Sequence, residues 1–287
     1  MKPPVFRYVA ARSLEEATTA LAAAGEDAKI LAGGQSLGPM LNLRLAHPSA
    51  LIDINHVPGL NDIRVEAGCV RIGAMVRHRG LETSALISAQ LPIMSAAAKH
   101  VAHVTIRNRG TFGGSLAHAD PAAEWPLLAC LLNAEMSLHS TTGSRQLTAD
   151  KFFVTTLTTA LRADEILTDI RIPELAVGTG WGFEEMSRRL GDFALAAAAA
   201  LVTVSAGKCK EARIALAGVG TTPLRAVGAE ALLTGQVLTA DALRAAGAKA
   251  ATECAPPSDI HATAEFRRHL ISVLTTRALT AAVERAT

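Results

Sequence analysis

Two short segments of this chain, Ala32-Gly33-Gly34-Gln35-Ser36 and Thr111-Phe112-Gly113-Gly114-Ser115, each carry a pair of glycines with a hydroxyl residue close behind. Glycine lets the backbone approach a ligand closely, and successive backbone N–H groups can form a nest that binds an anion. Either segment alone would be interpreted as an ordinary turn, because short motifs match by chance. The two together predict a pair of backbone cradles, from different parts of the fold, that close on one phosphate-bearing ligand.

The commoner phosphate-binding patterns are absent from both segments. Neither reads G-x-G-x-x-G, so a Rossmann nicotinamide site is not indicated, and neither ends in Gly-Lys-Ser/Thr, so a P-loop is not indicated. A net charge of +2 and 3% aromatic residues offer neither the basic footprint nor the stacking platform of a nucleic-acid-binding protein. The longest wholly apolar run, residues 193–202, is too short to span a membrane, and no apolar stretch of a signal peptide follows Met1. We therefore expect a cytoplasmic protein without a transmembrane segment.

The cysteines are scattered and form no C-x-x-C pair. Zinc and iron–sulfur sites usually need clustered thiolates, so we expect reduced thiols and no cluster held by this chain. His100 and His103 are three residues apart and could share a metal, but no third ligand stands at a useful spacing. We expect hydrogen-bonded histidines and no metal site. The four cysteines are Cys69, Cys130, Cys209 and Cys254.

Hydrophobic periodicity and capping signals divide the chain into three units. The first, residues 1–56, is βαβ-like, with a capping box at Ser13 and Glu16 and a helix stop at Gly25. The second, residues 57–177, mixes strands and helices. The third, residues 178–287, is a small α+β unit with a three-stranded sheet followed by helices. The expected strands are 5–10, 29–31, 51–54, 63–65, 70–72, 134–139, 164–172, 181–188, 195–204 and 210–217, and the expected helices are 14–24, 77–82, 92–102, 124–132, 225–233, 239–253 and 263–285.

Further motifs accompany the glycine segments in a fixed order: Ala119-Asp120-Pro121, then Glu165-Ile166-Leu167 before Ile172-Pro173, then Arg188-Arg189 before Gly191-Asp192-Phe193-Ala194. Over essentially the whole chain this order resembles the FAD-binding medium subunit of molybdenum hydroxylases, the carbon monoxide dehydrogenase and xanthine dehydrogenase group. The resemblance implies an α+β fold: a two-lobed FAD-binding domain of the vanillyl-alcohol-oxidase (PCMH) type. Residues 1–56 and 57–177 would be its lobes, and 178–287 the flavoprotein C-terminal domain.

The resemblance also implies which residues hold the cofactor. Glu124 would bond hydroxyls of the flavin chain, Val101 would lie over the flavin ring, and Phe193 near it. Ile166 and Leu167 match a strand whose backbone meets the polar edge of the ring. Asp120 would either bind beside Glu124 or cap the helix that begins near Pro121. The pyrophosphate and nearby ribityl chain would be wrapped by Lys29, Ile30, Leu31, Ala32, Gly33, Gly34, Gln35 and Ser36 from one lobe and by Thr111, Phe112, Gly113, Gly114 and Ser115 from the other.

This sequence departs from the family pattern at several of these positions. Gln35 stands where the family often has His, and Ser115 where it often has Asn or Asp. Phe193 replaces a Tyr of some members and keeps the ring contact without the hydroxyl. Some members carry a lysine where Glu184 and Glu185 stand. We expect FAD binding to survive these changes, because the Gln35 amide still offers a donor and an acceptor.

The implied function is that of an electron-transfer flavoprotein, an oxidoreductase subunit with no catalytic residue of its own. Electrons would pass from molybdopterin on a large subunit through [2Fe–2S] clusters on a small subunit to this FAD, and then to an external acceptor. The assembly would be a dimer of heterotrimers in the cytoplasm, with contact to the inner face of the membrane through its partners left open. Two alternatives are a self-sufficient flavin reductase or oxidase, similar to the enolpyruvyl reductase of cell-wall synthesis, and a scaffold that has lost its flavin. The substrate of the complex and its acceptor are not indicated.

Overall fold

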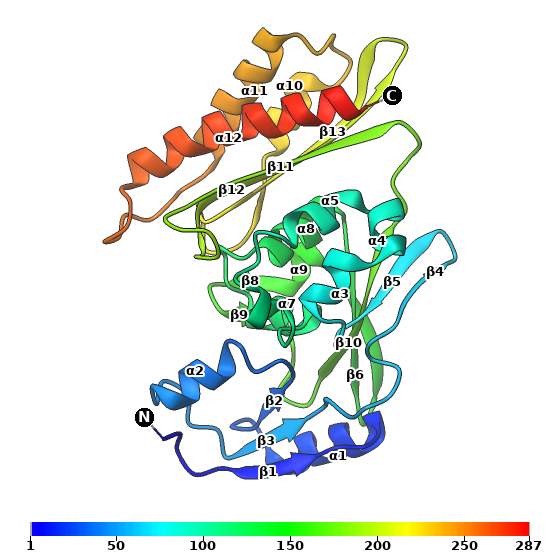
Figure 1. The fold of residues 1–287 in the computed structure, drawn as a ribbon, viewed down its shortest axis with the longest axis vertical. Helices are drawn as coiled ribbons and strands as arrows, with labels where there is room; N and C mark the ends of the chain where they lie inside the picture. Colours follow the sequence, from blue (N-terminus) through cyan, green and yellow to red (C-terminus); the bar gives the residue numbers. More distant parts are fainter. Residues whose placement is uncertain (1, 287) are drawn as a thin grey trace.

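The computed structural model, which describes residues 2–286, places its three larger sheets one after another along the long axis of the molecule (Figure 1). The N-terminal sheet lies at one end, the middle sheet follows, and the C-terminal sheet with its covering helices forms the other end. The α+β architecture predicted from the sequence is confirmed. Among residues 2–286, no helix combines the length and the hydrophobicity that crossing a membrane would require.

The first sheet is parallel and has the order β1-β3-β2, with β1 at Arg7–Ala10, β3 at Ala50–Asp53 and β2 at Lys29–Leu31. Helix α1 (Leu14–Ala24) connects β1 to β2, and α2 (Leu37–Asn42) follows β2. The Ser13 side chain accepts the Glu16 N–H at 3.0 Å, and Gly25 ends α1 with φ 76°. The carboxylate of Glu16 accepts the backbone N–H of Arg12 at 2.7 Å. In a standard capping box it would accept the N–H of the N-cap residue, Ser13, which is one residue later.

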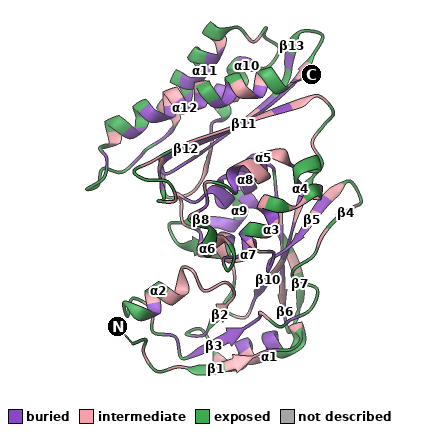
Figure 2. Cartoon of the chain, in the orientation of Figure 1, coloured by how far each residue is buried: buried purple, intermediate pink, exposed green. Residues whose placement is uncertain are grey.

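The middle sheet is antiparallel and has the order β4-β5-β10-β6-β7. This unit contains the buried aromatic residues Phe112, Trp125, Phe152 and Phe153. Its helix α8 is buried along its whole length (Figure 2). The predicted helix 92–102 ends at Ala97, and α4 and β7 were not predicted. The elements are β4 (Ile63–Glu66), β5 (Cys69–Gly73), α3 (His78–Thr83), α4 (Ala85–Gln90), α5 (Pro92–Ala97), α6 (Val104–Arg107), α7 (Phe112–His118), α8 (Glu124–Leu131), β6 (Glu135–Ser140), β7 (Gly143–Thr148), α9 (Ala149–Phe152), β8 (Phe153–Thr155), β9 (Thr158–Thr159) and β10 (Ile166–Pro173).

The third sheet is antiparallel and has the order β11-β12-β13-β14. Its three long strands and the three helices after them agree with the prediction, and the two-residue strand β14 adds a fourth to the expected three. The helices pack on one face of the sheet, and its other face meets the middle unit at α5 and α8 (Figure 1). The elements are β11 (Thr179–Ser187), β12 (Ala194–Ser205), β13 (Lys208–Ala217), β14 (Leu224–Arg225), α10 (Val227–Leu233), α11 (Ala240–Glu253) and α12 (Ala264–Arg285).

Small residues let α12 lie directly on this sheet. A Cβ on Gly180 would collide with the Ala282 carbonyl oxygen, and a Cβ on Gly182 with the Ala278 carbonyl oxygen. Side chains of a strand alternate between its two faces. The alternate residues Trp181, Phe183 and Glu185 therefore point toward the middle unit.

Candidate functional site

The structure brings the two glycine segments together. A Cβ on Gly33 would meet the backbone carbonyl oxygen of Arg109 and would lie 2.7 Å from the Gly110 Cα. A Cβ on Gly114 would lie 3.7 Å from the Cβ of Ala32. The loop after β2 and the backbone leading into α7 are thus in contact, as the two-cradle hypothesis requires, although the chain between them builds much of the middle unit.

A polar network that the sequence did not predict joins the two units at this contact. The Asn55 side-chain amide donates to the Ala32 carbonyl at 2.8 Å, and Arg77 donates to Asn55 Oδ1 at 2.6 Å. Arg77 also donates to the Arg109 carbonyl at 2.5 Å. Asn55 follows a parallel strand at its carboxyl end, where ligand-binding residues gather in α/β sheets, and that position could have identified it. Nothing in the sequence distinguishes Arg77 from the other arginines.

We expect Arg77→Met to loosen this joint. The substitution keeps much of the side-chain length and removes both hydrogen bonds, each of them from a charged donor. The free energy of unfolding should fall by about 1.5–3 kcal/mol, the range for a hydrogen bond to a charged group, and ligand retention should fall with it. Urea denaturation measures the loss. Arg79→Met is the matched control, because Arg79 is exposed and pairs only with Glu82, so its loss should cost under about 1 kcal/mol.

The first glycine segment has the free donors of an anion-binding nest. Within residues 2–286, none of the backbone N–H groups of residues 32–36 donates to a protein acceptor, and all five residues are half-buried. Gly34 has φ 70°, a conformation that favours glycine. Gln35 turns its side-chain amide back to the Gly33 carbonyl at 2.8 Å and so stabilises the loop. Successive unpaired N–H groups at one turn are the donors that a phosphate oxygen needs.

The second glycine segment was expected to be a loop with free N–H groups. That expectation was wrong. Residues 112–115 form the first turn of α7, and Thr111 caps the helix by accepting the Gly114 N–H at 3.1 Å. The Phe112 and Gly113 N–H groups donate to the carbonyls of Val76 and Ala74, each at 2.9 Å. A Cβ on Gly113 would lie 2.7 Å from the Ala74 Cα, so the glycine serves close packing here. Ligand contact from this segment is left to the half-buried Gly114 and Ser115.

Several predicted site residues lie in the core. Phe112 is fully buried and packs edge-on against Trp125, with ring centroids 5.5 Å apart, so its side chain belongs to the core beneath α7 and not to the ligand-facing surface. Ile166 packs into the first unit's core and Leu167 into the middle unit's core. Val101 is 7% exposed, on the edge of that same core. The remaining predicted residues are placed as follows: Lys29, Ile30 and Leu31 form β2, and Phe193 is exposed just before β12.

A histidine fixes the backbone beneath the second segment. His78 is buried, its Nδ1 accepts the Trp125 indole N–H at 3.0 Å, and its backbone N–H donates to the Gly110 carbonyl at 3.0 Å. Burial, followed by the positive charges of Arg77 and Arg107, lowers the His78 pKa to about 3, so the ring is neutral at pH 7. The two histidines considered for a metal face different neighbours: the His100 ring packs on Phe183, and His103 lies against Gly191.

Acidic side chains gather where the middle unit meets the third sheet. Asp120 accepts the Ala122 N–H at 2.9 Å and so closes the turn before α8, which begins at Glu124 as the expected helix 124–132 does, and not near Pro121. Glu124 is 8% exposed, and burial raises its pKa to about 7. Burial, and next the charge of Glu124, raise the pKa of Glu185 on β11 to about 8. The sequence predicted Glu124 and Asp120 but gave Glu185 no role.

These raised pKa values predict how stability depends on pH. Both glutamates titrate at a higher pH in the folded protein than the 4.5 usual for an unfolded chain, so the folded state binds more protons between pH 4.5 and 8. Their contribution to stability is therefore complete below pH 4.5 and is lost as the pH rises through 7 and 8. For the protein without ligand, we expect thermal melts from pH 5 to 8 to fall less steeply in Glu185→Gln than in the wild type. Glu184→Gln should retain the wild-type slope.

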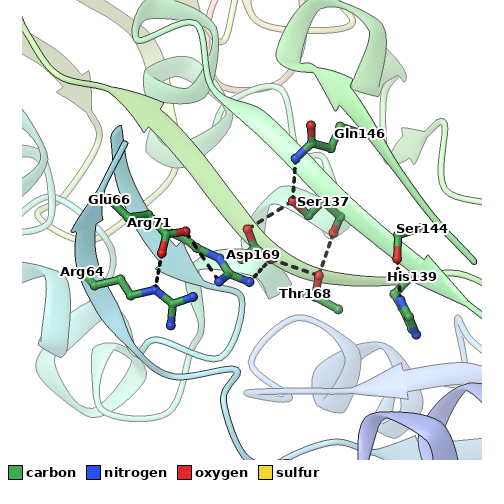
Figure 3. Close-up of polar contacts among 9 residues, drawn as sticks. All are labelled: Arg64, Glu66, Arg71, Ser137, His139, Ser144, Gln146, Thr168 and Asp169. Carbon is green, nitrogen blue, oxygen red and sulfur yellow. Dashed lines mark hydrogen bonds and ion pairs between the residues drawn. The ribbon is translucent and has the colours of Figure 1, made fainter. Parts of the chain in front are cut away.

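Two surface hollows contain none of the predicted site residues. One, of about 760 Å³, lies beside Asn55, Arg77 and Asn108. The other, of about 630 Å³, is lined by residues of β5, β6, β7 and β10. Figure 3 shows its buried carboxylate, Asp169, which accepts from Arg71 at 2.8 Å and Ser137 at 3.1 Å, so its hydrogen-bonding capacity is used within the protein. The backbone N–H groups of the first glycine segment, in contrast, have no protein acceptor among residues 2–286.

The two ends of the candidate site differ in charge. Free N–H groups lie at the first glycine segment, with the positive charges of Arg77 and Arg109 at its contact with the second unit, whereas Asp120, Glu124 and Glu185 lie toward the third sheet. The cationic end suits phosphate, and carboxylates suit hydroxyl donors. An extended ligand with a phosphate portion and a hydroxyl-bearing portion matches this order.

Known proteins resemble this chain over almost its whole length. The family model described as "FAD binding domain in molybdopterin dehydrogenase" matches residues 4–175, and "CO dehydrogenase flavoprotein C-terminal domain" matches residues 181–282. The chain is 44% identical to the "6-hydroxypseudooxynicotine dehydrogenase complex subunit alpha" of Paenarthrobacter nicotinovorans, over 100% of this chain and 97% of the relative. It is 41% identical to the "Carbon monoxide dehydrogenase medium chain" of Hydrogenophaga pseudoflava, over 98% of each.

Solved structures give the same result. A chain of the carbon monoxide dehydrogenase from Hydrogenophaga pseudoflava, in a form lacking the Mo-pyranopterin moiety of its cofactor, superposes with a TM-score of 0.98 at 42% identity, covering 100% of both chains. A chain of quinoline 2-oxidoreductase from Pseudomonas putida 86 superposes with a TM-score of 0.96 at 40% identity, covering 100% of this chain and 99% of that one.

Proposed function

Because the chain belongs to the family of FAD-binding medium subunits of molybdopterin dehydrogenases, we propose that it carries FAD as the electron-transfer subunit of a molybdenum hydroxylase. The observation that carries this proposal is the row of unpaired N–H groups at residues 32–36, held against the second unit by Asn55 and Arg77. When bound, FAD supplies the redox chemistry, and the protein supplies binding and orientation.

The proposed binding assigns each group a task. The N–H groups of residues 32–36 bind the pyrophosphate, with Gly114 and Ser115 approaching it from α7. Glu124 accepts hydrogen bonds from hydroxyls of the flavin chain, and Asp120 holds the turn that positions it. Val101, Phe193 and the backbone at Ile166 and Leu167 surround the flavin ring. The proposed domain boundaries are those expected from the sequence: lobes at 1–56 and 57–177, and the C-terminal domain at 178–287.

We propose that the partners are a large subunit with molybdopterin and a small subunit with [2Fe–2S] clusters, assembled as a dimer of heterotrimers in the cytoplasm. Electrons from the clusters would leave the FAD for an external acceptor. The words "medium chain" and "complex subunit alpha" in the names of two relatives support a multi-subunit complex. The four scattered thiols also support it, because the clusters then need another chain.

Purification of the chain, alone and co-expressed with the products of its neighbouring genes, tests the proposal. We expect a flavin absorption spectrum with one FAD per chain, and co-purification of a molybdopterin subunit and a cysteine-rich subunit. A protein that neither carries FAD nor binds it when the cofactor is added contradicts the proposal and favours the scaffold alternative. Turnover of a small substrate by the isolated flavoprotein favours the reductase alternative.

A further inference from the structure

Arg267, the fourth residue of α12, is a charged residue enclosed within the third unit. Its side chain is 6% exposed. Nη1 donates to the backbone carbonyls of Leu195 and Gly218, the second at 3.2 Å, and Nη2 donates to Asp259 Oδ2 at 2.6 Å. Its Nε is fully buried without a partner. Apolar residues of similar volume often stabilise such an enclosed position equally well, so the arginine calls for an explanation other than stability.

The two carbonyls lie where the third sheet approaches the proposed flavin site. Leu195 is the second residue of β12 and follows Phe193 by two positions, and Gly218 comes directly after β13. A Cβ on Gly218 would lie 2.9 Å from the Leu195 carbonyl oxygen and 3.1 Å from the Ala194 carbonyl oxygen. One guanidinium group thus clamps the ends of two strands at a place that has no room for a side chain.

Gly218 also connects this clamp to the middle unit. Its backbone N–H donates to the Pro121 carbonyl at 2.8 Å. Pro121 lies in the turn that Asp120 closes, directly before Glu124 at the start of α8. The hydrogen bonds of Arg267 therefore reach both segments that carry proposed contacts of the flavin: the one after the ring contact and the one before the contact with the flavin chain.

We propose that Arg267 is a positioning residue for the flavin end of FAD. It holds Leu195 and Gly218 together. The backbone that leads back to Phe193 and the turn that precedes Glu124 are thereby kept in a fixed relation. This inference rests on the proposed function, which assigns the first of these residues to the flavin ring and the second to the flavin chain. Arginine suits the task because its planar head bonds several acceptors in a fixed geometry, whereas lysine is a point charge on a flexible stem.

Two other roles fit these contacts less well. Direct binding of an anion would need an accessible guanidinium group, and that of Arg267 is enclosed among three protein acceptors. Anchoring of the segment before α12 would need only the bond to Asp259. That carboxylate also accepts the N–H groups of His261 at 2.8 Å and Ala262 at 3.0 Å, so it organises the segment without the arginine. Neither role explains the two bonds to the backbone of the sheet.

The proposal predicts a loss that is confined to the flavin end of the cofactor. Arg267→Met keeps much of the side-chain length and removes all three hydrogen bonds, so the backbone at Leu195 and Gly218 becomes free to separate. FAD should bind ~10-fold more weakly. ADP, which has the pyrophosphate but no flavin, should bind as it does to the wild type. The visible circular dichroism of bound flavin should change as well, because it reports the surroundings of the ring.

The experiment compares wild type, Arg267→Met, Arg267→Lys and Arg225→Met as full chains stripped of cofactor, each titrated with FAD and separately with ADP. Arg225 is the matched control, because it also joins the third sheet to the middle unit, through the Cys130 carbonyl and Asn133 at the opposite end of α8. Arg225→Met should lower the melting temperature and retain wild-type affinity for both ligands. Arg267→Lys retains the ion pair with Asp259 and should restore part of the FAD affinity that Arg267→Met loses.

Several outcomes would overturn the inference. One is a lower melting temperature in Arg267→Met with wild-type FAD affinity and an unchanged flavin spectrum, which would assign the residue to structure alone. Another is an equal loss of affinity for FAD and ADP. Should Arg267→Met not fold, wild-type FAD affinity in Arg267→Lys has the same force. A wild-type protein that binds no FAD would defeat the proposed function itself, which is a different result from any of these.

Discussion

Gly33→Ala is expected to yield a folded protein that purifies without flavin. The added methyl group would meet the Arg109 carbonyl and lie 2.7 Å from the Gly110 Cα, and both are backbone atoms that cannot rotate away. Relief of the clash must move the first glycine segment away from the second unit, at a cost of about 1–3 kcal/mol for overpacking. It also moves Ala32, whose carbonyl accepts from Asn55. The N–H groups of residues 32–36 then no longer face the rest of the site. The flavin absorbance per chain after gel filtration measures how much bound FAD is lost.

Gly38→Ala is the control for this change. Gly38 lies five residues further along the same loop-to-helix segment, within α2, and a Cβ there meets nothing within 4 Å. Replacing a helical glycine with alanine should raise stability by about 0.5–1 kcal/mol and leave the flavin content unchanged. Full flavin occupancy in Gly33→Ala would contradict the role given to the contact between the two segments.

Trp125→Ala is expected to lower the free energy of unfolding by about 3–5 kcal/mol, the range for removing a large buried aromatic side chain. Trp125 is fully buried between Phe112, the first residue of α7, and His78. Its loss leaves a cavity beneath α7 and removes the donor to His78, whose ring packs on Gly110. Stability and cofactor retention should therefore fall together. Urea denaturation followed by far-ultraviolet circular dichroism measures the change without using tryptophan fluorescence.

The chain's other tryptophan provides the comparison. Trp181 is half-buried on β11, with the Arg285 guanidinium 4.1 Å above its ring, and it lies away from the glycine segments. Trp181→Ala should cost less stability and leave the flavin content intact. Trp125→Phe preserves most of the volume and removes only the indole N–H, so it should fall between wild type and Trp125→Ala. Equal losses in Trp125→Ala and Trp181→Ala would mean that Trp125 has no special position under the site.

The sequence predicted the long elements well because their signals are local. The helix at 14–24 carries its own cap and stop, and the C-terminal strands and helices are long and periodic. Helix α4 and strand β7 were missed. Six residues give little periodicity, and β7 alternates polar residues on an exposed edge. The second glycine segment was misjudged because glycine disfavours helices, whereas packing against Ala74 requires a residue without a side chain at that place.

The candidate site was predictable to the extent that backbone chemistry defines it. The nest at residues 32–36 follows from two glycines after a strand. Arg77 was not predictable, because its importance comes from reaching Asn55 and the Arg109 carbonyl, which are distant in sequence. Glu185 was equally hidden: its burial depends on how the third sheet docks on the middle unit, and no pattern within β11 reveals that contact.

The bond between the lobes through Asn55 and Arg77 has a consequence for how the cofactor enters. These hydrogen bonds join protein groups to one another, so they hold the two units together independently of the flavin. Binding into a prepared site avoids the entropy cost of ordering loops, and that raises affinity. The same rigidity narrows the entrance for a long, bent molecule. Exchange of FAD should accordingly be slow in both directions, with the rate governed by brief separation of the lobes.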